Sequence, residues 1–99
     1  MHACGHDLHT ASLLGVIKIL NSVRHKFSGT IKFIFQPAEE MLPGGAAQMI
    51  SQGVLKNPNV NIALAQHVYT ELDVGKVGFR KGQYMASTDE IYILSLIHI

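Results

Sequence analysis

The order of the apolar patterns along the chain, first helical, then strand-like, then helical and strand-like again, restricts the possible folds more than any other feature. From Thr10 to about Lys26, apolar side chains recur at helical spacing and predict a mostly buried helix. Asp7 or Thr10 is its expected N-cap, and residues 27–29 are expected to end it. The apolar stripe consists of Leu13, Val16, Ile17, Leu20 and Val23, widened by Ala11, Leu14 and Ile19.

A strand and a second, shorter helix are predicted next. Residues 30–36 are rich in β-branched and aromatic side chains, and Pro37 ends this segment because it has no N–H to give to a ladder. After a polar turn, the glycine pair at 44–45 is expected to open a helix from Ala46 to about Gln52.

The remaining segments are predicted to be extended. A turn at 57–59 precedes a second short strand at 62–67. Residues 75–82 form a further extended segment between glycines, and residues 89–99 are again strand-like. The last segment would be an adhesive edge if it were left unpaired.

A strand, a helix and a strand in this order imply a right-handed crossover between parallel strands, so both strands end at the same edge of the sheet. Glu39 and Glu40 follow one of these ends, and His67 closes the other. The first helix begins near that edge with Cys4 and His6. The sequence therefore predicts an α/β fold in which these five side chains meet in the crevice where open sheets bind ligands.

Composition argues against several classes of function. The 99 residues make one small domain, and the net charge of +1 without a dense Lys or Arg cluster argues against a nucleic-acid partner. A single cysteine cannot form an internal disulfide and favours a reducing compartment, which predicts a cytoplasmic protein. The longest apolar run, residues 91–99, is far short of the ~20 residues that span a membrane.

Each member of the cluster also has an ordinary structural interpretation. A free cysteine such as Cys4 is usually a small buried hydrophobic residue, and a histidine near a helix start, such as His6, often caps it. Adjacent carboxylates in a turn are more often solvated, and His67 alone is more often a hydrogen-bonded histidine. Their joint occurrence at one sheet edge favours a metal site, because packing does not require thiolate, imidazole and carboxylate to meet. A cysteine nucleophile paired with a histidine is the second enzymatic interpretation of Cys4.

Three segments together resemble the three successive motifs of the M20 family of metallopeptidases, in its amidohydrolase branch. These segments are Met1 to Ala11, Phe35 to Glu40, and Gln66 to Val68. The resemblance continues through residues 75–78 and 82–87 and covers most of the chain. This branch includes hippurate hydrolases, N-acyl-amino-acid amidohydrolases and enzymes that cleave auxin conjugates.

The resemblance implies roles for the residues at matching positions. The implied metal ligands are Cys4, His6, Glu40 and His67. Glu39 resembles the general base, and only support of the ligand loop is assigned to Asp7 and His9. The implied cofactor is a divalent metal, with two ions per full-length subunit, chosen among Zn²⁺, Mn²⁺ and Co²⁺.

The resemblance also implies an architecture, namely part of a three-layer zinc-peptidase-like catalytic domain with a mixed, mostly parallel sheet. Residues 1–88 would be a partial metallohydrolase domain, and residues 89–99 the start of a lid and dimerisation domain or an aberrant tail. Members of the family are longer and carry a further metal-binding histidine, so we expect a truncated gene or an artefactual tail. The parent protein is expected to form homo-oligomers through the lid.

The implied reaction is hydrolysis of the amide bond of an N-acyl amino acid, hippurate-like or N-acetylated, by a metal-activated water with Glu39 as general base. This small-molecule substrate is the expected partner of the full-length protein, and the 99 residues alone are expected to be inactive. Two alternatives stay open. One is a non-catalytic α/β module that associates through the apolar segment after Asp89, and the other is an M20 dipeptidase or biosynthetic deacylase.

Overall fold

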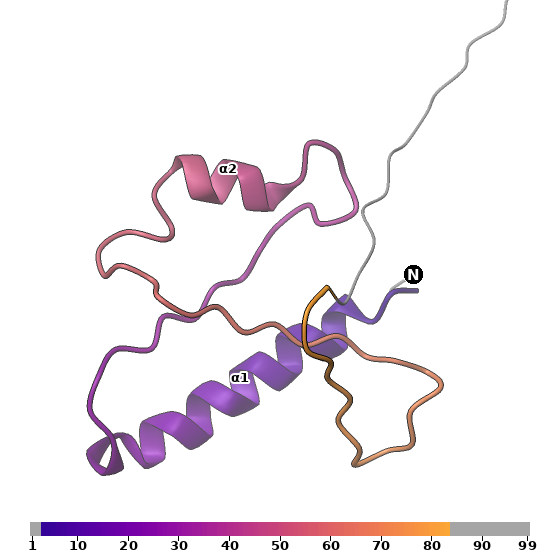
Figure 1. Cartoon of the computed structure of the whole chain (residues 1–99), viewed down its shortest axis with the longest axis horizontal. Coiled ribbons are helices and arrows are strands. Elements are labelled where there is room, and N and C mark those ends of the chain that lie inside the picture. Colours follow the sequence, from indigo (N-terminus) through magenta and orange to yellow (C-terminus); the bar gives the residue numbers. More distant parts are fainter. Residues whose placement is uncertain (1–2, 84–99) are drawn as a thin grey trace, which may run out of the picture. The chain divides into compact units, whose positions relative to one another are not determined.

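In the described part of the chain, the regular structure consists of two α-helices and one turn of 3₁₀-helix (Figure 1). The structure is a computed structural model that describes residues 3–83. The elements follow in the order α1 (His6–Ser22), η1 (Arg24–Lys26) and α2 (Gly45–Ser51). The chain divides into two compact units, Met1–Tyr69 and Thr70–Ile99, and all three elements belong to the first.

Helix α1 begins at a glycine rather than at a side-chain cap. The predicted start at Thr10 with Asp7 or Thr10 as N-cap is wrong, because the helix starts at His6 and Gly5 is the N-cap, with φ 75° and no side-chain hydrogen bond. Glycine adopts this left-handed backbone without steric cost. The Thr10 hydroxyl instead donates to the His6 carbonyl inside the helix, over 2.9 Å. The α-helix ends at Ser22, about four residues before the predicted end. The 3₁₀ turn η1 continues the helical stretch to Lys26, and Phe27 is extended, so the predicted stop at residues 27–29 is confirmed for the stretch as a whole.

The prediction that this helix is mostly buried is also wrong. No residue of the helix is buried, and Leu14 and Ile19 are 56% and 65% exposed. A helical side chain is buried only where another segment packs on it. In the described residues, only one face of α1 is partly covered. The half-buried residues recur at helical spacing along that face, and with Val23 just after the helix they are His6, His9, Leu13, Ile17, Leu20 and Val23.

The segments expected to be strands run as irregular chain, and no strand is assigned anywhere in residues 3–83. A strand exists only through ladder hydrogen bonds to a neighbouring strand, so its propensity alone does not produce one. Residues 30–36 are instead hydrogen-bonded to a later segment through the side chain of Lys32. The ammonium of Lys32 donates to the carbonyls of Val54 and Lys56, over 2.9 and 2.7 Å. The α/β sheet and its crossover stay a prediction.

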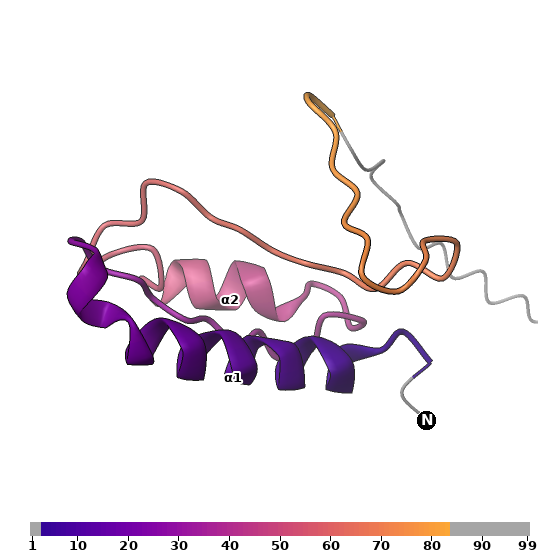
Figure 2. The same cartoon turned by 90° about the horizontal axis from the view of Figure 1, so that it is seen from below.

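Helix α2 confirms the second helical prediction to within one residue at each end, since Gly45–Ser51 was expected as 46–52. Turns over residues 52–59 follow it and include the expected turn at 57–59. From there the chain returns toward the N-terminal end of α1, as Figure 2 shows. This return brings residue 67 beside residue 4, where their side chains make contact.

In the second unit, residues 70–83 are exposed and include an ion pair between Lys76 and Asp73. The strand-like segment 89–99 and the domain boundary expected after residue 88 lie outside the described residues. Within the part of the chain that the structure describes, no helix has the length and apolar character needed to cross a membrane.

Candidate metal centre

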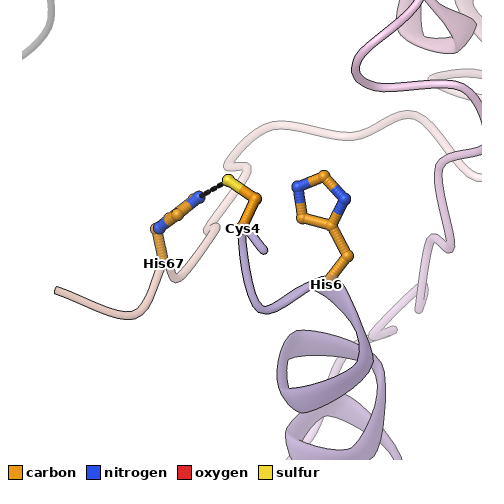
Figure 3. A group of neighbouring side chains, drawn as sticks. All are labelled: Cys4, His6 and His67. Atoms are coloured by element: carbon orange, nitrogen blue, oxygen red, sulfur yellow. Dashed lines mark hydrogen bonds between the residues drawn. The ribbon is translucent and has the colours of Figure 1, made fainter. Parts of the chain in front are cut away.

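Three potential metal ligands meet where α1 begins. The ligand atoms of Cys4, His6 and His67 all lie within 4.8 Å of one another. The Cys4 sulfur lies between the two imidazoles and is 3.4 Å from Nε2 of His67, as Figure 3 shows. Cys4 and His6 come from the N-terminal end of α1, and His67 comes from the segment that returns after α2.

A second group of ligands shares one member with the first. The ligand atoms of His6, Glu39 and Glu40 also lie within 4.8 Å of one another. Nε2 of His6 is 3.4 Å from Oε2 of Glu39 and 3.6 Å from Oε1 of Glu40. Both carboxylates are open to solvent, with side chains 57% and 65% exposed. His6 therefore stands between a sulfur-containing group and a carboxylate group.

The backbone explains why the two carboxylates lie here. Glu39 and Glu40 lie in a turn that begins at Ala38. The Ala38 carbonyl accepts hydrogen bonds from the N–H of Met41 and the N–H of Gly45, each over 3.3 Å. Gly45 is buried against Pro37, the residue just before this turn. The start of α2 thus holds the Glu39–Glu40 turn against the end of the preceding segment.

The hydrogen bond of the His67 ring orients it as a ligand. Nδ1 of His67 lies 2.7 Å from the carbonyl oxygen of Val68, which can only accept, so Nδ1 carries the proton. In the neutral imidazole, Nε2 is then the unprotonated nitrogen and its lone pair faces Cys4. Histidines that bind metals are typically fixed in this way, by donating their other N–H to a carbonyl or carboxylate.

The electrostatics of the centre disfavour a thiolate when no cation is present. Burial raises the pKa of the Cys4 thiol, and a hydrogen bond with Glu40 and the negative charges of Glu40 and Glu39 raise it further. Burial lowers the pKa of His9, as do the neighbouring His67 and His6, while Asp7 and Glu39 act in the opposite direction. A bound cation reverses this balance for sulfur, because a coordinated thiol is deprotonated.

The donor set fits a divalent transition metal. A tetrahedral ion with bonds of about 2.0–2.3 Å separates its ligand atoms by roughly 3.3–3.8 Å, so a cluster confined within 4.8 Å needs only small adjustments. Thiolate and imidazole suit Zn²⁺ and Co²⁺, and carboxylate together with imidazole also suits Mn²⁺. The residues present therefore match the cofactor that the sequence led us to expect.

All five side chains singled out from the sequence are brought to this centre, but not around a single point. The ligand atoms form two overlapping groups, one with Cys4 and one with Glu40, which share His6. A hydrogen bond between Cys4 and Glu40 also connects the two groups. Val68 belongs to the third motif but received no role from the sequence, and its backbone contacts both His9 and His67. For His9 a signal existed in its position three residues after His6, which places both on one face of α1.

Comparison with known proteins identifies the family to which these residues belong. The sequence model of the family described as "Peptidase family M20/M25/M40" matches residues 1–93. No solved structure matches the chain.

Several related proteins match most of this chain. An N-acyl-L-amino acid amidohydrolase of Geobacillus stearothermophilus is 45% identical over 93 residues, which are 94% of this chain and 25% of that protein. An N-acetylcysteine deacetylase of Bacillus subtilis is 45% identical over 95% of this chain and 24% of its own length. An IAA-amino acid hydrolase of Arabidopsis thaliana is 46% identical over 87% of this chain and 19% of its own length. The chain thus spans about a quarter or less of these relatives.

Proposed function

The chain belongs to the peptidase family M20/M25/M40, and from this membership we propose that its full-length protein hydrolyses the amide bond of N-acyl amino acids with the help of a divalent metal. The substrate class is supported by the names of the relatives, which describe removal of an acyl group from an amino acid or cleavage of an amino acid conjugate. The metal is supported by the two ligand groups around His6.

The observation that carries the proposal is the position of His6 between the two groups. Its imidazole belongs both to the group with Cys4 and His67 and to the group with Glu39 and Glu40. Simple packing has no need for a thiol, two imidazoles and two carboxylates in one partly exposed cluster. A metal-dependent hydrolase can use all of them, because thiolate, imidazole and carboxylate bind a transition metal and a second carboxylate can act as the base.

Each residue has a proposed role. Cys4, His6, Glu40 and His67 hold the metal. When bound, such an ion supplies Lewis-acid chemistry, polarising a carbonyl and making water acidic enough to react near neutral pH. The Glu39 carboxylate takes one proton from the attacking water and delivers it to the nitrogen of the leaving amine as the C–N bond breaks. Glu39 ends the cycle unprotonated, ready for another water.

A cobalt titration tests the metal roles in the chain itself. Co²⁺ bound by a thiolate gives a charge-transfer absorption, so Cys4→Ala is expected to abolish that absorption and to weaken binding by about tenfold or more. Glu40→Gln is expected to weaken binding because a ligand loses its charge, and Glu39→Gln to leave it close to that of the unsubstituted chain. His25→Gln, an exposed histidine in η1, is the matched control and is expected to change nothing.

The same titration separates the proposal from the alternative of a non-catalytic module. Binding that does not depend on Cys4 would contradict the metal site and favour a non-catalytic module. Equal weakening by Glu39→Gln and Glu40→Gln would instead contradict the division of roles between the two carboxylates.

A further inference from the structure

Val68, the residue that follows His67, is held by three contacts around the metal centre. Its N–H donates to Nε2 of His9 over 3.0 Å. Its carbonyl lies 2.7 Å from Nδ1 of His67. Its side chain lies over Gly5, where an added Cβ would come within 2.8 Å of Cγ2 of Val68. The backbone beside a proposed ligand is thus fixed to the start of α1.

We propose that His9 is a positioning residue that holds His67 in place by accepting the N–H of Val68. The inference rests on the proposed function, since it treats His67 as a metal ligand. With Val68 fixed, the His67 ring is held by its bond to the Val68 carbonyl, and its Nε2 faces the Cys4 sulfur. His9 thereby pre-organises the group of Cys4, His6 and His67.

The chemistry of the His9 ring separates it from the ligands. Neither ligand group includes His9, although its ring centroid lies 4.4 Å from that of His67 and 5.6 Å from that of His6. The lone pair of its Nε2 is taken by the Val68 N–H, so a neutral His9 must carry its proton on Nδ1. The His9 ring therefore lies beside His6 and His67, and its only acceptor atom is used by the N–H of Val68.

Helix α1 makes His9 a firm anchor. His9 lies in the first turn of the helix, and its own N–H donates to the Gly5 carbonyl over 3.1 Å. Its backbone is thus tied to the loop that carries Cys4 and His6, and its ring to the segment that carries His67. One residue links two parts of the ligand set that are more than sixty positions apart in sequence.

The first test needs no metal. Long-range ¹H–¹⁵N NMR of the metal-free chain is expected to show His9 protonated on Nδ1. Amide exchange of Val68 is expected to become about five- to tenfold faster in His9→Leu, which removes the acceptor. His9→Gln supplies an amide oxygen in its place and is expected to restore slow exchange. Leucine is a strong helix former, so circular dichroism is expected to show α1 intact in His9→Leu.

The second test follows the consequence for the ligands. In a cobalt titration, His9→Leu is expected to weaken binding by about 10- to 100-fold, the usual cost of losing a group that orients a ligand. His9→Gln is expected to bind nearly as well as the unsubstituted chain. His25→Gln removes a histidine near the other end of α1 and is expected to leave both Val68 exchange and cobalt binding unchanged.

The outcomes distinguish this inference from the proposed function. A proton on Nε2 of His9, or Val68 exchange that His9→Leu leaves unchanged, would overturn the positioning role while the metal site could still stand. Equal weakening of cobalt binding by His9→Leu and His9→Gln would also overturn it, because the imidazole itself would then be required. Val68 exchange that behaves as expected in a chain without Cys4-dependent cobalt binding would refute the proposed function, and the role of His9 with it.

Discussion

At the scale of single residues, the site depends on Gly5 having no side chain. It is buried, has φ 75°, and separates the two proposed ligands Cys4 and His6. Its missing Cβ leaves room for the Val68 side chain. An L-residue there would meet both an unfavourable backbone conformation and a contact that real Cβ atoms do not make.

Gly5→Ala is therefore expected to lower the free energy of unfolding by about 1–3 kcal/mol and to weaken cobalt binding, because Val68 and His67 must move. Gly15→Ala is the matched control. Gly15 lies inside α1 with no atom within 4 Å of an added Cβ, so alanine is expected to stabilise the chain by about 0.5–1 kcal/mol through helix propensity. Chemical denaturation and cobalt titration of both variants measure these effects. Unchanged cobalt binding in Gly5→Ala would show that Val68 is not seated as described.

At the scale of elements, the start of α2 positions the carboxylate turn. An added Cβ on Gly45 would overlap the carbonyl oxygen of Pro37 and lie 2.8 Å from its carbon. Both atoms belong to the backbone, so relief requires the helix and the turn to separate. The Glu39–Glu40 turn lies between Pro37 and Gly45 in sequence, so its geometry depends on the close approach of these two residues.

Gly45→Ala is expected to destabilise the chain by about 1–3 kcal/mol and to weaken cobalt binding, since the carboxylates move away from His6. Gln48→Ala, an exposed substitution in the same helix, is expected to be neutral in both measurements. Denaturation and cobalt titration again provide the readouts. If Gly45→Ala lost stability but bound cobalt normally, the carboxylate turn would not depend on α2.

At the scale of the whole molecule, the described residues lack a buried apolar core. In residues 3–83 the buried positions are Gly5 and Gly45, and both lie where the backbone of the metal centre is most closely packed. Large apolar side chains such as Leu8, Ile50 and Leu64 are instead exposed. Among residues 3–83, the two buried positions thus both lie at the site.

The chain covers 25% of the Geobacillus stearothermophilus relative, and its two ligand groups share His6, which leaves few ligands for two ions. We therefore expect the 99 residues alone to turn over no N-acyl amino acid. A chimera in which residues 1–93 replace the matching segment of that relative is expected to hydrolyse N-acetyl amino acids. Glu39→Gln in the chimera is expected to lower kcat by about 10²- to 10⁴-fold, the usual contribution of a general base.

Hydrolysis assays of the isolated chain, the chimera and its Glu39→Gln variant provide the measurement. Turnover by the isolated chain would contradict the first expectation. A Glu39→Gln chimera as active as the unsubstituted one would remove Glu39 from the mechanism.

The sequence by itself predicted the family, the presence of both helices and the five side chains that the structure brings together at the candidate site. Helical periodicity and glycine positions are local signals, so α2 could be predicted to within one residue at each end. The predicted end at about Lys26 matches the end of η1, whereas α1 itself already ends at Ser22. The start of α1 could not be predicted, because Gly5 caps it through backbone conformation and not through a side chain that propensity recognises. Motif order supplied Cys4, His6, Glu39, Glu40 and His67.

Only the tertiary structure decided how these residues are shared between two groups and what holds them. Sequence spacing does not show that Nε2 of His9 accepts the Val68 N–H, because this bond joins positions 59 residues apart. Nor could the periodicity of α1 establish burial, which depends on the segments that pack against a helix. Local patterns predict helices, because the hydrogen bonds of a helix join residues close in sequence, whereas strands and contacts between distant residues depend on the path of the whole chain.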